Sequence, residues 1–127
     1  MPQYLLSADV SFSAAHTLPG VPLCERFHGH DWKIRLTVTV AAENLTNGMG
    51  LDFRIIQQIG EDAVSDFDHT YLNDLEPFKT DPPTAENIAR VLSDRTSLLL
   101  AEQAPTAKLT EIEVWETEQY RVVYRPE

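Results

Sequence analysis

The chain has 127 residues, 43% of them hydrophobic, which suits a single domain over residues 1–127 with one core. Its formal net charge of −10 comes from 20 acidic and 10 scattered basic residues, a balance that excludes nucleic acid and anionic membranes as partners. No apolar run reaches the roughly 18 residues of a membrane-spanning helix, no secretory signal opens the chain, and the single cysteine cannot form an internal disulfide, so we expect a cytoplasmic protein.

Two strands are predicted in the amino-terminal part of the chain. In the first, alternate positions are apolar and end in a histidine: Val10, Phe12, Ala14 and His16. In the second, apolar residues alternate with polar ones: Trp32, Ile34, Leu36, Val38 and Val40. Extending this alternation backwards places His28 and His30 on the same face of the strand as Trp32.

Two helices are predicted next, separated by a polar connection over 66–74. Asp52 is a natural N-cap for a helix over 53–67, and Thr84 for a helix over 85–101. Both stretches carry apolar residues at helical spacing, so each is expected to bury one side.

Two more strands are predicted at the carboxyl end, joined by the short link Thr117–Glu118, which favours a hairpin. The order of elements is then strand, strand, helix, helix, strand, strand. Adjacent strands with short links favour antiparallel pairing. We therefore expect an α+β fold, a four-stranded antiparallel sheet with two helices on one face.

Three of the four histidines are candidate metal ligands. Residues two apart on a strand point the same way, so His28 and His30 reach one point, and antiparallel pairing brings His16 opposite them. Three neutral imidazoles are the ligand set of a catalytic zinc site with an open fourth position, although copper, nickel or iron also accept them. The alternative is that they are ordinary residues at strand ends.

Cys24 lies in a loop after two prolines, close to these histidines. A nearby cation would lower the pKa of its thiol and make it reactive, and the alternative is a small buried apolar residue. The adjacent residues Asp68 and His69 form a second candidate group. A carboxylate that holds an imidazole suits proton transfer, whereas the alternative is two solvated loop residues.

Glu116 continues the inward alternation of Ile112 and Val114, so it is expected to face the covered side of the sheet. A buried carboxylate requires a partner. That partner is either an arginine or backbone amide of the chain, or a ligand with adjacent N–H donors, such as the edge of a heterocycle.

Six motifs follow one another along most of the chain: FSAAH, C-x3-HGH, GMGLDF, DHTYLND, PTAEN and VWET. In this order and spacing they resemble the 6-pyruvoyltetrahydropterin synthase superfamily, above all its bacterial 6-carboxy-5,6,7,8-tetrahydropterin synthase branch, which acts in queuosine and 7-deazapurine biosynthesis. The resemblance implies a tunnelling fold, whose sheets join into a barrel. It also implies a homo-oligomer, a tetramer or hexamer, with active sites at subunit contacts.

The resemblance implies a role for each candidate residue. The zinc ligands that it implies are His16, His28 and His30. The catalytic groups that it implies are the Cys24 thiol and His69 with its partner Asp68. Glu116 matches the carboxylate that anchors the pterin ring, and Thr84 lies where relatives contact the pterin through the start of a helix.

The implied reaction converts 7,8-dihydroneopterin triphosphate into 6-carboxy-5,6,7,8-tetrahydropterin and releases acetaldehyde and triphosphate. A related enzyme would eliminate triphosphate and make 6-pyruvoyltetrahydropterin. A protein of a different class would hold structural zinc or a pterin without turnover. A triphosphate substrate also requires local basic residues in a chain of net charge −10, and an adjacent subunit is one source of them.

Overall fold

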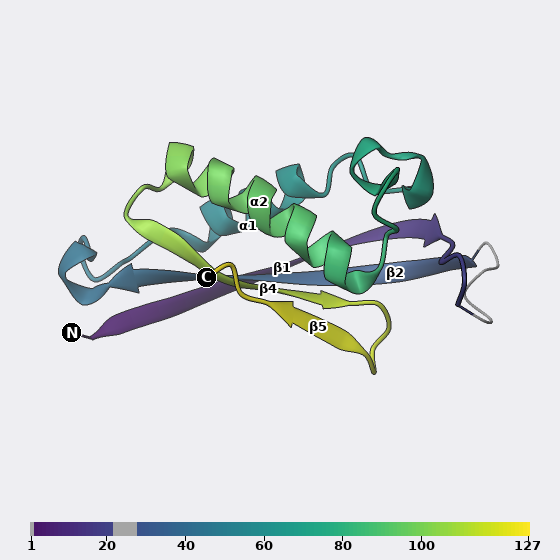
Figure 1. The fold of residues 1–127 in the computed structure, drawn as a ribbon. Coiled ribbons are helices and arrows are strands. Elements are labelled where there is room, and N and C mark those ends of the chain that lie inside the picture. The colour runs from purple at the N-terminus through teal and green to yellow at the C-terminus, as the bar shows by residue number, and fades with distance from the viewer. Residues whose placement is uncertain (1, 22–27) are drawn as a thin grey trace.

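The computed structural model describes residues 2–21 and 28–127, and Cys24 lies outside these ranges. The described residues form one five-stranded sheet with two helices packed on the same face (Figure 1). The strand order in the sheet is β3-β1-β2-β4-β5. The predicted α+β architecture is therefore confirmed, with both helices on one side.

Four long or medium strands form the antiparallel part of the sheet: β1 (Gln3–His16), β2 (His28–Ala41), β4 (Ala107–Trp115) and β5 (Arg121–Tyr124). β1 and β2 pair along their whole length, β2 pairs with β4, and β4 with β5. β1 begins well before the predicted apolar alternation. Its amino-terminal residues are mostly exposed, so apolar periodicity does not mark them.

The fifth strand corrects the prediction of a purely antiparallel sheet. β3 (Thr70–Tyr71) pairs with Ala14 and Ala15 of β1 in the parallel direction, at the edge of the sheet. A strand of two residues has no alternation that a sequence pattern would reveal. This short pairing ties the connection between the helices to the end of β1.

The helices are α1 (Phe53–Ala63) and α2 (Ala85–Gln103), and their predicted caps are confirmed. Asp52 accepts a hydrogen bond of 2.9 Å from the Arg54 N–H, and Thr84 accepts one of 3.1 Å from the Asn87 N–H. Each cap satisfies a free donor of the first helical turn. No helix in the described part of the chain is long and apolar enough to cross a membrane.

α1 ends at Ala63 and not at 67 as predicted. The chain turns at Val64, and this turn buries Phe67 against the rings of Phe12 and Phe78, at centroid distances of 5.4 and 5.6 Å. Arg95 of α2 donates a hydrogen bond of 2.8 Å to the Ala63 carbonyl, which compensates for the lost helical partner. Three short 3₁₀ turns complete the connections: Ala42–Asn44, Leu72–Asp74 and Glu76–Phe78.

The core lies between the sheet and the two helices. Its largest fully buried apolar side chains are Trp32, Phe67, Ile34, Leu36, Ile56, Ile59, Leu72, Ile88, Leu92 and Ile112. α1 approaches the sheet closely at Gly60, where an added Cβ would lie 2.9 Å from side-chain atoms of both Leu36 and Val10. The absence of a side chain at this position therefore sets the spacing of the two layers.

In the part of the chain that the structure describes, no helix covers the opposite face of the sheet (Figure 1). Polar side chains pair across the strands on this face. Arg35 of β2 donates two hydrogen bonds to Asp9 of β1, at 2.7 and 3.0 Å, and the hydroxyls of Ser7 and Thr37 lie 2.8 Å apart. The alternation along β1 and β2 thus separates an apolar covered face from a polar uncovered one, as predicted.

Candidate active site

The end of β1 and the start of β2 bring three histidines together on the covered face. His16 is the cross-strand partner of His28, and Ala14 is the partner of His30. The imidazole centroids lie 4.5 Å apart for His16 and His28, 5.2 Å for His16 and His30, and 4.8 Å for His28 and His30. The convergence predicted from strand alternation is confirmed.

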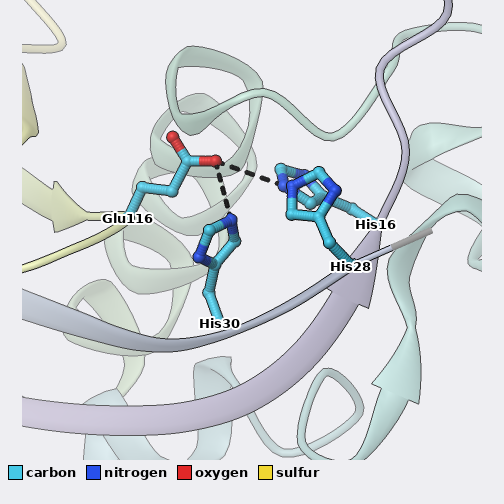
Figure 2. Close-up of side chains that lie close together, drawn as sticks. All are labelled: His16, His28, His30 and Glu116. Carbon is cyan, nitrogen blue, oxygen red and sulfur yellow. Dashed lines mark ion pairs between the residues drawn. The ribbon is translucent and has the colours of Figure 1, made fainter. Parts of the chain in front are cut away.

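Glu116 completes the cluster from the residue that follows β4 (Figure 2). Its Oε2 atom lies 3.2 Å from the Nε2 atom of His16 and 3.2 Å from that of His30. One nitrogen or oxygen atom from each of the four residues, His28 included, lies within 4.8 Å of the others. Alternation along the strand predicted the covered position of Glu116, but not its contact with the histidines.

The proton positions at His16 follow from a hydrogen bond to the backbone. Its Nδ1 atom lies 2.8 Å from the carbonyl oxygen of Pro83, and a carbonyl only accepts, so Nδ1 carries the hydrogen. Burial lowers the pKa of His16, so the ring is neutral at neutral pH and its Nε2 carries a lone pair. That lone pair points toward the Glu116 carboxylate.

The arrangement of these side chains favours a bound cation. Within residues 2–21 and 28–127, the buried Nε2 atoms of His16 and His30 have no hydrogen-bond partner, and both lie 3.2 Å from an oxygen of Glu116. Burial also lowers the pKa of His30, although the Glu116 carboxylate opposes this shift. Ligand atoms around a tetrahedral zinc ion lie about 3.3 Å apart. The two distances from Glu116 Oε2 are 3.2 Å, and the candidate atoms of all four residues lie within 4.8 Å of one another. The four residues therefore fit a metal ion.

The donor set of imidazoles and a carboxylate suits zinc, and it would also accept copper, nickel or iron. The indole of Trp32 packs edge-to-face against two of the rings, at a centroid distance of 5.1 Å from His16 and 5.3 Å from His30. The Trp32 side chain is fully buried and its Nε1–H points to the Ala14 carbonyl, at 3.4 Å. Strand alternation predicted Trp32 as a core residue and gave no signal for this supporting role.

Asp68 and His69 also form the predicted pair. The Oδ2 atom of Asp68 lies 3.0 Å from Nδ1 of His69, and its Oδ1 atom accepts a hydrogen bond of 2.9 Å from the Ser13 N–H. The Ser13 hydrogen bond, and next the His69 side chain, lower the pKa of Asp68. The His69 N–H donates in turn to the Ser13 carbonyl at 2.6 Å, so Ser13 of β1 holds both residues.

The backbone of His69 is in the left-handed region, with φ of 59°, a conformation that costs free energy for a residue other than glycine. Its imidazole is 82% exposed, in contrast to the buried His16. A shallow hollow of about 370 Å³ is lined by residues of both groups: Ser13, Ala14, Ala15, Gly29, His30, Asp31, His69 and Thr70. In the described residues, the pair and the histidine cluster are separate groups that border one hollow.

Of the remaining predicted site residues, the structure describes Thr84 but not Cys24. Thr84 is the N-cap of α2, and the adjacent Pro83 supplies the carbonyl that fixes His16. Cys24 falls outside the described residues. The role of Pro83 was missed because a backbone carbonyl carries no signal in residue type, although the double proline before a helix cap marks a rigid segment.

Comparisons with known proteins identify the family of this chain. A family model described as 6-pyruvoyl tetrahydropterin synthase matches residues 5–127. A Bacillus subtilis protein named 6-carboxy-5,6,7,8-tetrahydropterin synthase is 33% identical over 130 residues, covering 95% of this chain and 84% of its own length. An Archaeoglobus fulgidus protein with a provisional form of the same name is 37% identical over 93 residues, covering 72% of this chain and 76% of its own.

The fold has a close counterpart among solved structures. The structure of Caenorhabditis elegans 6-pyruvoyl tetrahydropterin synthase superposes with a TM-score of 0.84 at 24% identity, covering 100% of this chain and 98% of that one. The family match spans nearly the whole chain, and the curated relatives carry the names of lyase-type synthases. This chain therefore belongs to the 6-pyruvoyl tetrahydropterin synthase family of enzymes.

Proposed function

We propose that the protein is a zinc-dependent 6-carboxy-5,6,7,8-tetrahydropterin synthase. It converts 7,8-dihydroneopterin triphosphate and one water molecule into 6-carboxy-5,6,7,8-tetrahydropterin, acetaldehyde and triphosphate. The names of relatives at 33% and 37% identity support this branch of the family. The observation that carries the metal dependence is the pair of Nε2 atoms, of His16 and His30, that face Glu116 and have no hydrogen-bond partner among the described residues.

His16, His28 and His30 would hold the zinc ion, with Glu116 beside them. When bound there, zinc supplies Lewis-acid polarisation of the oxygens on the substrate side chain, which makes the adjacent C–H acidic. In this proposal the Glu116 carboxylate anchors the pterin ring through adjacent N–H donors. A ring held by Glu116 would lie next to the histidines, because Glu116 Oε2 is 3.2 Å from two of them.

Proton transfer is assigned to His69, Asp68 and Cys24. Asp68 accepts the Nδ1–H of His69, which leaves Nε2 of His69 free to exchange a proton with the substrate. The Cys24 thiolate is the second proton acceptor, as the family resemblance implies. Each such residue typically contributes a factor of about 10²–10⁴ to the rate. A pterin contact from Thr84 would come from the start of α2, next to Pro83.

The proposal includes a homo-oligomer, a tetramer or hexamer, with active sites at subunit contacts. Two features of residues 2–21 and 28–127 support it. β5 and most of β1 are edges of the sheet, and no helix covers its polar face. Unpaired edges readily add the strand of another copy. Analytical ultracentrifugation tests this part, and a monomer at micromolar concentration would contradict it. The proposed location is the cytoplasm, in queuosine or 7-deazapurine biosynthesis.

The reaction is tested by incubating zinc-loaded protein with 7,8-dihydroneopterin triphosphate and identifying the products by mass. Acetaldehyde together with 6-carboxy-5,6,7,8-tetrahydropterin is the expected result. The description of the family model favours one alternative, 6-pyruvoyl tetrahydropterin synthesis, which would release triphosphate without acetaldehyde. If the protein binds zinc but produces neither compound, it is a non-catalytic zinc-binding or pterin-binding module.

Cys24→Ala separates the enzyme from such a module. The variant is expected to bind zinc like the wild type and to lose turnover, because the thiol is assigned to proton transfer and not to metal binding. Zinc is measured by competition with a chromophoric chelator and turnover by acetaldehyde release. Unchanged turnover in Cys24→Ala would remove the thiol from the mechanism.

A further inference from the structure

Asn87 stands in the first turn of α2, and its side chain turns back toward the residues before the helix. Its Nδ2 atom donates a hydrogen bond of 2.8 Å to the carbonyl oxygen of Pro82. Its own backbone N–H donates to the Thr84 hydroxyl at 3.1 Å. Asparagine is a weak helix former, so its position here calls for a role other than helix propensity.

The Pro82 carbonyl is held from two directions. It accepts a hydrogen bond of 2.8 Å from the Thr84 N–H as well as the one from the Asn87 amide. The rings of Pro82 and Pro83 fix their own φ angles, so few backbone rotations remain in this segment. Orienting the Pro82 carbonyl therefore also orients the peptide that follows and restricts where the Pro83 carbonyl points.

The Pro83 carbonyl oxygen is the acceptor for Nδ1–H of His16, at 2.8 Å. The His16 ring is fully buried, and its Nε2 atom is one of the unpartnered nitrogens of the cluster. An acceptor at Nδ1 selects the tautomer whose lone pair lies on Nε2, and it also fixes the rotation of the ring. Two hydrogen bonds, joined by the Pro82–Pro83 peptide, thus connect Asn87 with the His16 ring.

We propose that Asn87 is a positioning residue for the metal site. It holds the Pro82–Pro83 segment, and through the Pro83 carbonyl it keeps His16 in the tautomer and orientation that bind a metal. This inference rests on the metal site of the proposed function. Loss of a residue that hydrogen-bonds a metal ligand and orients it lowers metal affinity by about 10–100-fold. Asn87 does not contact His16 itself but acts through Pro83, so we expect its loss to lower the affinity by about tenfold.

The first test compares zinc affinity in the wild type, Asn87→Ala and a control, by competition with a chromophoric chelator. Glu86→Ala is the matched control, because Glu86 is an exposed acidic residue of the same first turn and its loss weakens the helix start without removing the Asn87 amide. Asn87→Ala is expected to bind zinc about tenfold more weakly, with Glu86→Ala close to the wild type. Equal affinities in Asn87→Ala and the wild type would overturn the proposal.

A second variant separates positioning from helix stability. Asn87→Asp keeps the size of the side chain and adds a charge that favours a helix start, but it has no donor for the Pro82 carbonyl. An added negative charge near a cation would by itself strengthen binding. Weaker zinc binding by Asn87→Asp, in spite of this charge, supports the positioning role, whereas binding tighter than that of the wild type contradicts it.

A third measurement does not depend on zinc. Long-range ¹H–¹⁵N spectra of the zinc-free protein report the tautomer of the His16 ring. The wild type is expected to show the Nδ1–H form alone, and Asn87→Ala a mixture of both forms. If the wild type shows this form but binds no zinc, the proposed function fails while the link from Asn87 to His16 stands. If the spectrum of His16 is the same in both proteins, the link itself is wrong.

Discussion

The histidine cluster and the Asp68–His69 pair border one hollow, but they are held in place by different means. His16 is fully buried, its ring packs against the indole of Trp32, and its Nδ1 atom lies next to the Pro83 carbonyl. His69 is 82% exposed, and it is held by two hydrogen bonds between residues 68–69 and Ser13, in a strained backbone conformation. His16 is thus positioned by burial together with one backbone carbonyl, whereas the exposed pair is positioned by backbone hydrogen bonds without burial.

The difference fits the tasks proposed for the two groups. A metal site gains from rigid, neutral rings in a dry environment, because the ligands must not be protonated or move. A group that exchanges protons needs access to substrate and solvent, which burial would restrict. Backbone strain offers a way to fix an exposed side chain without covering it.

Removing His16, the buried member of the histidine cluster, is expected to have the largest effect. His16→Ala should lose both turnover and zinc, with affinity falling by more than about 100-fold, since even the partners of ligands cost 10–100-fold. It also leaves the Pro83 carbonyl without its partner. Chelator competition and acetaldehyde release measure the two losses. Retained zinc affinity would show that packing does not build a metal site here.

His69→Ala is the matching change in the exposed group, and it should separate the two functions. We expect turnover to fall by about 10²–10⁴-fold, because a proton-transfer group is lost. Zinc affinity should stay at the wild-type value, since no hydrogen bond or ring contact joins His69 to the cluster within residues 2–21 and 28–127. A parallel loss of zinc would mean that the two groups are one coupled site.

Gly60→Ala probes packing away from both groups. The added methyl would meet Leu36 and Val10 side-chain atoms at 2.9 Å, so the helix or the sheet must shift. We expect the free energy of unfolding to fall by about 1–3 kcal/mol, as measured in urea. Glu61→Ala, at an exposed position of the same helix, is the control and should change stability little. If the free energy of unfolding of Gly60→Ala equals that of the wild type, α1 and the sheet can accommodate the added methyl group.

The smallest expected effect is a local pH dependence of the exposed group. The Ser13 N–H, and next His69, lower the pKa of Asp68 below its usual value of 3.8. Because the folded pKa lies below the unfolded one, the contact is fully stabilising above about pH 3.8 and is lost as the pH falls through the folded pKa. The amide shift of Ser13, followed by NMR, should report this loss. In Asp68→Asn that acid transition should disappear, and its persistence would assign it to another group.

The two groups also differ in how far the sequence predicts them. His16, His28 and His30 were expected to converge, because strand alternation and the antiparallel pairing of two consecutive strands can both be inferred from the local sequence. The contact of Glu116 with them depends on where β4 lies in the sheet, and no local pattern contains that information. Adjacency suggested the Asp68–His69 pair. Its backbone strain and its bonds to Ser13 arise from tertiary structure alone.

The same limits apply to the fold. Caps and apolar spacing predicted both helices, and Asp52 and Thr84 are the observed N-caps. The end of α1 was misplaced because burial of Phe67, a tertiary contact, overrides the helical preference of residues 64–67. β3 was missed because two residues are too few to show alternation, and its pairing is decided by the end of β1.

The position of Trp32 has a practical consequence for spectroscopy. The chain has two tryptophans, and they lie on opposite faces of the sheet. Trp32 contacts two imidazoles of the cluster, whereas Trp115 has the cationic groups of Lys33, Arg35 and Arg121 within 5.5 Å of its ring centroid. In a Trp115→Phe protein, the remaining indole would be an intrinsic fluorophore whose emission reports occupancy of the neighbouring centre in real time, without any added dye.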